Sequence, residues 1–240
     1  MSTEALHDVT AALLAGGLGT RLRAAVADRP KVLAEVDGRP FLALLLERLA
    51  EAGVHRAVLC TGHMADQVEA ALGHSFAGMA LDYSREAEPL GTGGALRLAA
   101  SRLDSGLVLA LNGDSFCGVD LRAFARAHRE AGVSASLVVV RVPDAAPFGR
   151  VAFDETGRVT RFEEKKASAG PGWVNAGVYL LARTLLLRTP EGRAVSLERE
   201  LFPAWIGDLH AFPASEPFID IGTPESYHRA MGLLRQGRLP

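Results

Sequence analysis

The chain has 240 residues, of which 48% are hydrophobic and 22% are charged, and its formal net charge is -2. This length and composition predict a single globular α/β domain, and a charge so close to neutral provides no basic surface for nucleic acid or for an acidic membrane. The sequence shows two cysteines, no signal-peptide pattern and no apolar run of membrane-spanning length, so we expect a reduced, cytoplasmic protein.

The first predicted strand, 9–14, ends in a glycine-rich stretch, Leu14-Ala-Gly-Gly-Leu-Gly-Thr-Arg-Leu22. Its closely spaced glycines let backbone N–H groups approach an anion, and Arg21 and Lys31 add positive charge. The P-loop pattern fails because no Lys-Ser or Lys-Thr follows, and the dinucleotide fingerprint G-x-G-x-x-G fails because Leu22 takes its last position. From its own residues the stretch is either a phosphate-binding loop or a tight turn.

Strand and helix patterns alternate through the next hundred residues. Pro40 opens a helix that ends near Gly53, followed by a strand at 54–60, a helix at 65–72 and a weaker strand at 79–83. A second glycine-rich loop at 84–95 leads into a helix at 92–103, and an apolar strand at 107–111 delivers Asp114. This order predicts a mostly parallel sheet whose carboxyl edge gathers both loops and Asp114, although Asp114 alone is also compatible with a solvated turn.

The pattern changes in the second part of the chain. After a helix at 121–131 and a strand at 134–140, residues 149–153 and 159–162 alternate like an antiparallel hairpin. The charge run at 163–166 is typical of a solvated strand end. The remaining predicted elements are a strand at 173–181, helices at 181–187 and 197–205, a strand from Phe218 to Asp220 and a helix at 224–234.

Seven motifs occur in a fixed order along nearly the whole chain. They are Leu14-Ala-Gly-Gly-Leu-Gly-Thr-Arg-Leu22, Pro30-Lys31, Pro89-Leu-Gly-Thr-Gly-Gly94, Asn112-Gly-Asp114, Glu164-Lys165, Asn175-Ala-Gly177 and Asp220-Ile-Gly-Thr-Pro224. Together they resemble the sugar-1-phosphate nucleotidyltransferases, and within them the heptose 1-phosphate guanylyltransferases most. The resemblance implies a Rossmann-like mixed, mostly parallel sheet flanked by helices, with a small antiparallel sugar-binding portion. It also implies one domain over residues 1–240, with a nucleotide-binding half over about 1–145 and a sugar-phosphate-binding half over about 146–240.

The resemblance also implies a role for each matching residue. By this resemblance the catalytic residues are Arg21, Lys31, Asp114 and Lys165. The metal ligands are Asp114 and Asp220, which bind Mg²⁺, with Mn²⁺ as a substitute. The nucleotide-binding residues are Leu14, Ala15, Gly16, Gly17, Gly19, Thr20, Arg21, Glu86, Glu88, Gly91, Thr92 and Gly113. The residues that bind the sugar 1-phosphate are Gly93, Asn112, Glu164, Lys165 and Asn175. Lys166 stands where the family commonly has proline, so either Lys165 or Lys166 meets the sugar phosphate.

The nucleotide is suggested by two acidic residues near the second glycine loop. A carboxylate at Glu86 or Glu88 can accept hydrogen bonds from N1–H and the N2 amino group of guanine, a pair of donors that adenine and thymine lack. GTP is therefore favoured, and the resemblance to the heptose 1-phosphate guanylyltransferases favours heptose 1-phosphate, with mannose or glucose 1-phosphate and another nucleoside triphosphate as alternatives. We expect no nucleic-acid or membrane partner, and a homodimer is compatible with the sequence.

Two functions of other classes compete with the enzyme. A non-catalytic subunit that senses nucleotide sugars is disfavoured because the ionic residues needed for turnover are all present, and a dinucleotide-binding protein is disfavoured by the failed fingerprint. Two other residues receive structural interpretations, His63 as a surface histidine and Trp173 as a packing residue.

Overall fold

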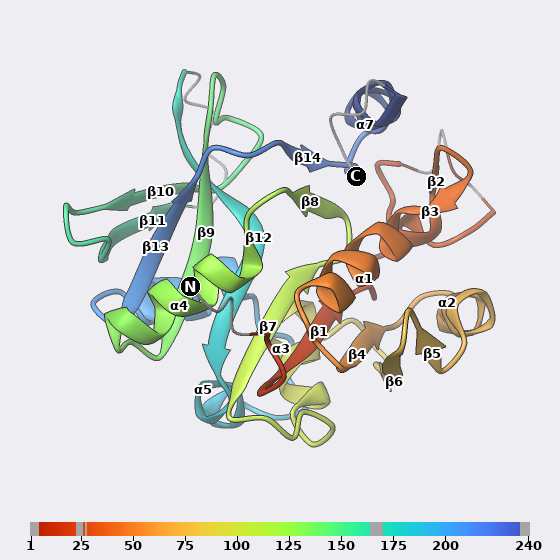
Figure 1. The fold of residues 1–240 in the computed structure, drawn as a ribbon, viewed down its shortest axis with the longest axis horizontal. Helices are drawn as coiled ribbons and strands as arrows, with labels where there is room; N and C mark the ends of the chain where they lie inside the picture. The colour runs from red at the N-terminus through yellow and green to blue at the C-terminus, as the bar shows by residue number, and fades with distance from the viewer. Residues whose placement is uncertain (1–4, 23–25, 27, 164–169, 236–240) are drawn as a thin grey trace.

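A ten-stranded sheet runs through the molecule, with helices on both of its faces (Figure 1). The structure, a computed structural model, describes residues 5–22, 26, 28–163 and 170–235. The strand order is β11-β10-β12-β7-β1-β4-β6-β5, and β9 pairs with both β12 and β13. These strands are β1 (Val9–Leu14), β4 (Arg56–Thr61), β5 (Ser75–Phe76), β6 (Met79–Arg85), β7 (Leu107–Asn112), β9 (Ala135–Val142), β10 (Arg150–Phe153), β11 (Val159–Glu163), β12 (Gly172–Ala182) and β13 (Leu209–Ala214).

The centre of the sheet is parallel, as the alternating strand and helix patterns predict. Strands β7, β1, β4 and β6 pair in parallel, while β12 joins β7 in the antiparallel direction and carries the β10–β11 hairpin. Because β1 lies between β4 and β7, the chain leaves it first toward one edge of the sheet and later returns to its other side. Ligands bind at such crossover points of open α/β sheets, at the carboxyl ends of the strands.

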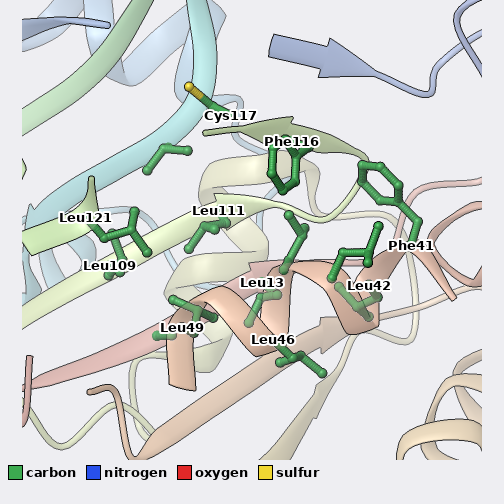
Figure 2. Packing of buried hydrophobic residues seen from close by; sticks show 14 of the residues in the cluster. Leu13, Phe41, Leu42, Leu46, Leu49, Leu109, Leu111, Phe116, Cys117 and Leu121 are labelled. Carbon is green, nitrogen blue, oxygen red and sulfur yellow. The ribbon is translucent and has the colours of Figure 1, made fainter. Parts of the chain in front are cut away.

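One hydrophobic core lies on each face of the sheet, because neighbouring residues of a strand point to opposite sides. Leu13 belongs to one core and Ala12 to the other. Helices α1 (Phe41–Glu51), α2 (Ala65–Leu72) and α4 (Leu121–Ala131) cover the first core. Figure 2 shows the leucines of α1 packed beside Leu13 and Leu111. The second core is covered by α3 (Gly91–Ala99), α5 (Arg183–Arg188), a π-helical turn (Leu197–Leu201) and α6 (Phe202–Ala204).

Short elements at the carboxyl edge complete the fold. A two-stranded antiparallel sheet joins β8 (Ser115–Cys117) to β14 (Phe218–Asp220), and α7 (Pro224–Arg235) follows β14 (Figure 1). A 3₁₀-helix spans Lys31–Leu33, and β2 (Glu35–Val36) pairs with β3 (Arg39–Pro40). The register of the β8–β14 pair places Asp220 opposite Ser115, so it brings the last of the seven motifs beside the Asn112-Gly-Asp114 motif.

The fold class is as predicted, with differences at several boundaries. Helix α3 ends at Ala99 rather than near 103, because the guanidinium of Arg183 donates two hydrogen bonds to the carbonyl of Ala100. Strand β12 continues to Ala182, where a helix is predicted to begin at 181, since Leu181 still pairs with both β7 and β9. Strand β13 is absent from the predicted elements. It contains Pro213, which is tolerated because β13 is an edge strand that pairs with β9.

Within the described residues, no helix combines the length and the apolar character needed to cross a membrane.

Candidate active site

The ends of β1 and β7 form the floor of the candidate site. Leu14 and Asn112 are paired across the two parallel strands, and the amide of Gly113 donates to the carbonyl of Leu14 at 3.0 Å. This hydrogen bond holds Gly113 beside the end of β1, so Asp114 follows at the carboxyl edge of the sheet, at the crossover point. The first glycine loop leaves β1 at the same place, so the structure brings together two motifs that lie nearly a hundred residues apart.

A cavity of about 250 Å³ lies between the two glycine loops. Nine of the residues that the sequence assigns to the site line it, namely Leu14, Gly16, Gly17, Lys31, Glu86, Gly91, Thr92, Asn112 and Asp114. Ala15 and Gly113 are buried beside it, while Thr20 is exposed on the same loop. Gly19 lies against Lys31, and a Cβ at Gly19 would be only 3.1 Å from Cβ of Lys31. The cavity has the position and the backbone lining expected of a nucleotide site.

Glu86 forms part of the cavity wall. Its Oε2 accepts a hydrogen bond from the amide of Leu90 at 3.0 Å, and its Oε1 would lie only 2.5 Å from a Cβ at Gly16. Glycine at position 16 therefore makes room for this carboxylate. Burial raises the pKa of Glu86 above its ordinary value, and the Leu90 amide opposes the rise. Glu88 is exposed, so the structure distinguishes the two acidic residues that the sequence left as alternatives.

Three charged side chains meet at the end of the cavity. Nζ of Lys31 lies 2.6 Å from Oδ2 of Asp114, and the two side chains are 11% and 34% exposed. The amide of Gly222 donates to Oδ1 of Asp220, and the amide of Ile221 donates to the carbonyl of Asp114 at 2.9 Å. The β8–β14 pairing thus holds the two aspartates beside each other.

The electrostatics of the two aspartates suit a hard cation. Burial and the neighbouring Asp114 carboxylate raise the pKa of Asp220 above its ordinary value, while Lys31 and Arg21 oppose the rise. Two carboxylates that repel each other in a partly buried place would be stabilised by additional positive charge. Carboxylate oxygens are the donors that Mg²⁺ prefers, and it commonly uses one or two of them while keeping several waters. The residues present therefore fit the metal that the sequence motifs imply.

The second glycine loop packs against a segment that the sequence did not connect with the site. The carbonyl of Val195 accepts hydrogen bonds from the amides of Gly93 and Gly94, at 2.9 and 3.2 Å. Thr92 Oγ1 donates to Glu198 Oε2 at 2.8 Å and accepts from the amide of Leu197. Gly93 is buried, and a Cβ there would approach Cδ1 of Leu201 to 2.8 Å, so its lack of a side chain serves packing. Glu198 lies 106 positions from Thr92, and no local pattern signals that contact.

A larger groove of about 1000 Å³ opens on the other side of Asp220. Arg21 and Asp220 line one part of it, and aromatic side chains, Phe148, Trp173 and Phe218, line another. Trp173 also packs edge-on against Phe153, with ring centroids 5.5 Å apart, which agrees with its predicted packing role. Asp220 borders this groove, whereas Asp114 borders the smaller cavity between the glycine loops.

Of the remaining residues named from the sequence, Asn175 and His63 are described by the structure, and those of the 164–166 segment are not. Asn175 is half-buried on β12, and its carboxamide is hydrogen-bonded to the hydroxyl of Tyr179 at 2.8 Å. His63 is exposed, as expected, although it also lines a small cavity beside Lys31 and Gly19. Glu164, Lys165 and Lys166 lie outside the described residues, so their roles stay predictions.

The sequence profile of the family described as "Nucleotidyl transferase" matches residues 10–237. The chain belongs to the nucleotidyl transferase family. Family membership confirms the resemblance inferred from the seven motifs.

Several members of the nucleotidyl transferase family are similar over most of this chain. A mannose-1-phosphate guanylyltransferase from Mycobacterium tuberculosis is 38% identical, over 98% of this chain and 67% of its own length. A D-glycero-alpha-D-manno-heptose 1-phosphate guanylyltransferase from Aneurinibacillus thermoaerophilus is 32% identical, over 92% and 96%. The crystal structure of HddC from Yersinia pseudotuberculosis superposes with a TM-score of 0.84 at 32% identity, covering 94% of this chain and 99% of that one. The same protein has also been solved in complex with GMP-PN.

The chain spans about two thirds of the mannose-1-phosphate guanylyltransferases it matches, 67% of the mycobacterial protein and 62% of one from Aspergillus fumigatus.

Proposed function

We propose that this nucleotidyl transferase catalyses guanylyl transfer from GTP to a sugar 1-phosphate. In this reaction a phosphate oxygen of the sugar 1-phosphate attacks the α-phosphorus of GTP. The bond from the α-phosphorus to the bridging oxygen breaks, and the products are a GDP-sugar and pyrophosphate. The activities of the guanylyltransferase relatives support this reaction, and so does the GMP-PN complex of the structural neighbour.

The observation that carries the choice of nucleotide is the position of Glu86. Its carboxylate is an acceptor without a proton to donate, and it stands in the wall of the nucleotide cavity beside Gly16. Guanine offers a matching pair of donors, N1–H and the N2 amino group. Hydrogen bonds to the carboxylate would also favour its charged form, against the burial that raises its pKa.

The charged residues have separate proposed roles. Arg21, exposed at the end of the first glycine loop, binds the β- and γ-phosphates that leave with pyrophosphate. Lys31 lies within the cavity and contacts the α-phosphate, where its charge offsets the negative charge that develops during transfer. Asp114 and Asp220 hold Mg²⁺, which when bound supplies further positive charge beside the phosphates. In the free protein Lys31 pairs with Asp114, which keeps both side chains in place before substrate arrives.

The acceptor we favour is a sugar 1-phosphate of manno configuration. Mannose 1-phosphate and D-glycero-D-manno-heptose 1-phosphate share that ring configuration, and both are named as substrates of relatives that are more than 30% identical to this chain. Of the two, the sequence motifs favour the heptose. The proposed binding place is the side of the smaller cavity lined by Asn112, which the motifs assign to the acceptor together with Asn175 on β12.

Substituting Glu86 by glutamine tests the proposed nucleotide directly. The amide keeps the shape of the carboxylate but replaces one acceptor oxygen by a donor, so guanine loses at least one hydrogen bond to a charged group. We expect kcat/KM for GTP to fall about 10- to 100-fold, while the low rates with ATP and UTP change far less. Glu88→Gln is the matched control, since Glu88 is exposed nearby. An unchanged preference for GTP in Glu86→Gln would overturn the role of Glu86.

A further inference from the structure

A chain of hydrogen bonds runs beneath the active site from β12 to β7. The amide of Gly177 donates to Oδ1 of Asn175 at 2.9 Å, and Nδ2 of Asn175 donates to the hydroxyl of Tyr179 at 2.8 Å. The Tyr179 hydroxyl in turn donates to Oδ1 of Asn112 at 3.4 Å. The chain therefore connects an asparagine on the second half of the molecule with one that lines the nucleotide cavity.

The direction of every hydrogen bond in this chain is set by the backbone of Gly177. A backbone N–H can only donate, so the Asn175 atom that faces it must be the carbonyl oxygen Oδ1. Nδ2 of Asn175 consequently faces Tyr179 and makes the hydroxyl an acceptor there. The hydroxyl has one proton, and that proton is left for Oδ1 of Asn112. Burial raises the pKa of Tyr179 well above its ordinary value, so the hydroxyl keeps this proton.

The local backbone is shaped for this arrangement. Gly177 has a φ of +74°, a conformation that favours glycine, and a Cβ there would approach Asn112 to 3.0 Å. The pairing of β12 with β9 shifts register between Asn175 and Tyr179, which separates this stretch from the regular ladder. The Asn112 side chain fills the space that glycine leaves.

The consequence is a fixed orientation of two carboxamides. With Oδ1 of Asn112 held by Tyr179, its Nδ2 is fixed beside Gly177, and its N–H groups remain to donate to a ligand in the cavity that Asn112 lines. Asn175 has one remaining N–H and is half-buried. Both asparagines then offer donors, and the matching ligand atoms are hydroxyl or ring oxygens of a sugar. Tyr179 is itself fully buried, with its ring packed against Phe202 at a centroid distance of 5.1 Å.

We propose that Tyr179 is a positioning residue, held by Asn175, which orients the carboxamide of Asn112 so that its N–H groups meet oxygen atoms of the sugar 1-phosphate. This proposal rests on the proposed function for the identity of the ligand. The orientation of Asn112 by Tyr179 is independent of it.

The kinetic test compares Tyr179→Phe with the unmodified protein, using GTP and the best sugar 1-phosphate. Phenylalanine keeps the ring and its packing on Phe202 but removes the hydroxyl, which frees the carboxamide of Asn112 to rotate and leaves Nδ2 of Asn175 without its acceptor. We expect KM for the sugar 1-phosphate to rise about tenfold, the effect of losing one well-placed hydrogen bond, while KM for GTP changes by less than about twofold. The control is Phe202→Leu, which disturbs the packing of the ring without touching the hydrogen bonds. It should lower the melting temperature and leave both KM values in place.

A second measurement needs no turnover. In ¹⁵N-labelled protein, the side-chain amide signals of Asn112 and Asn175 are assigned by their loss in Asn112→Asp and Asn175→Asp. We expect Tyr179→Phe to shift or broaden both signals, whereas Phe202→Leu leaves them sharp. Unchanged amide signals would refute the positioning role whether or not the protein is active. Shifted signals with an unchanged KM for the sugar 1-phosphate would refute the link to the sugar. If no sugar 1-phosphate reacts even with the unmodified protein, the proposed function fails while the amide signals still decide the orientation.

Discussion

Lys31 and Asp114 form the closest charged contact of the site, although 83 positions separate them in the chain. Each side chain would otherwise be a partly buried charge without a partner, which is costly. With Asp220 beside them, the three side chains carry a net charge of about -1 when ionised, and a divalent cation would reverse that sign. Lys31 and the cation would then compete for Asp114, which predicts opposite effects of removing the lysine and of removing a carboxylate.

Binding of Mn²⁺ to the nucleotide-free protein, followed by electron paramagnetic resonance, tests this competition. Asp220→Asn keeps the shape of the side chain but removes its charge, so the affinity should fall about tenfold or more. Lys31→Ala should bind Mn²⁺ at least as tightly as the unmodified protein, because the competing ammonium group is gone, yet its kcat should fall more than its KM for GTP rises. Equal weakening of Mn²⁺ binding by both substitutions would contradict the proposed ligand set.

Local sequence signals predicted most of the helices and strands, because each has a clear hydrophobic period and defined ends. Helix α4 is an example, since Asp120 accepts from the amides of Arg122 and Ala123 and Gly132 ends the helix in the left-handed conformation. The elements that escaped prediction depend on distant partners. Strand β8 has three residues and exists through its pairing with β14.

The residues of the candidate site also divide into those that local sequence signals predicted and those that depend on distant contacts. The residues carried by motifs, such as Glu86, Lys31 and Asp114, could be named from sequence because charge and glycine content stand out locally. Tyr179 and Glu198 could not. A buried tyrosine in an apolar strand looks like a core residue, and a glutamate in a helical segment looks like a surface residue. Their contacts with Asn112 and Thr92 arise only when β12 and the 195–201 segment pack against the first half of the chain.

Helix α4 and strand β9 are joined by a buried histidine whose ionisation should affect stability. Nδ1 of His128 lies 2.8 Å from Oγ of Ser136, and burial lowers the pKa of His128 to about 4. The unfolded chain takes up a proton on this histidine near pH 6.5, but the folded protein does not until about pH 4. The unfolded state therefore binds more protons in this range, so the free energy of unfolding decreases as the pH falls from about 6.5 toward 4.

Urea unfolding of the unmodified protein and of His128→Gln, at pH 7.5 and pH 5.0, measures this contribution. Between these pH values the histidine should account for a loss of about 2 kcal/mol in the free energy of unfolding. That loss should be absent in His128→Gln, even though the variant is less stable at pH 7.5. His74→Gln provides the control, because the side chain of His74 is 74% exposed. The interpretation fails if His128→Gln keeps the full pH dependence of the unmodified protein.

At the scale of the whole molecule, one continuous sheet serves two ligands. Strand β12, from the predicted sugar-phosphate half, pairs directly with β7, from the predicted nucleotide half. The cavity between the glycine loops is lined by Asp114 and the larger groove by Asp220, so the two openings meet at the pair of aspartates. This arrangement suits an in-line transfer between two bound phosphates, in which positioning and charge do most of the catalysis. The homodimer, the cytoplasmic location and the division near residue 145 stay predictions.

Pyrophosphate release by the purified protein with Mg²⁺ tests the proposed transfer most directly, using GTP, ATP, UTP and dTTP, each with heptose, mannose and glucose 1-phosphates. We expect the fastest release with GTP and a manno-configured acceptor, matched by formation of the GDP-sugar, and no release when EDTA removes the metal. A preference for glucose 1-phosphate with dTTP or UTP would contradict guanylyl transfer. Absence of release with every pair would contradict catalysis itself and favour a subunit that only binds nucleotide sugars.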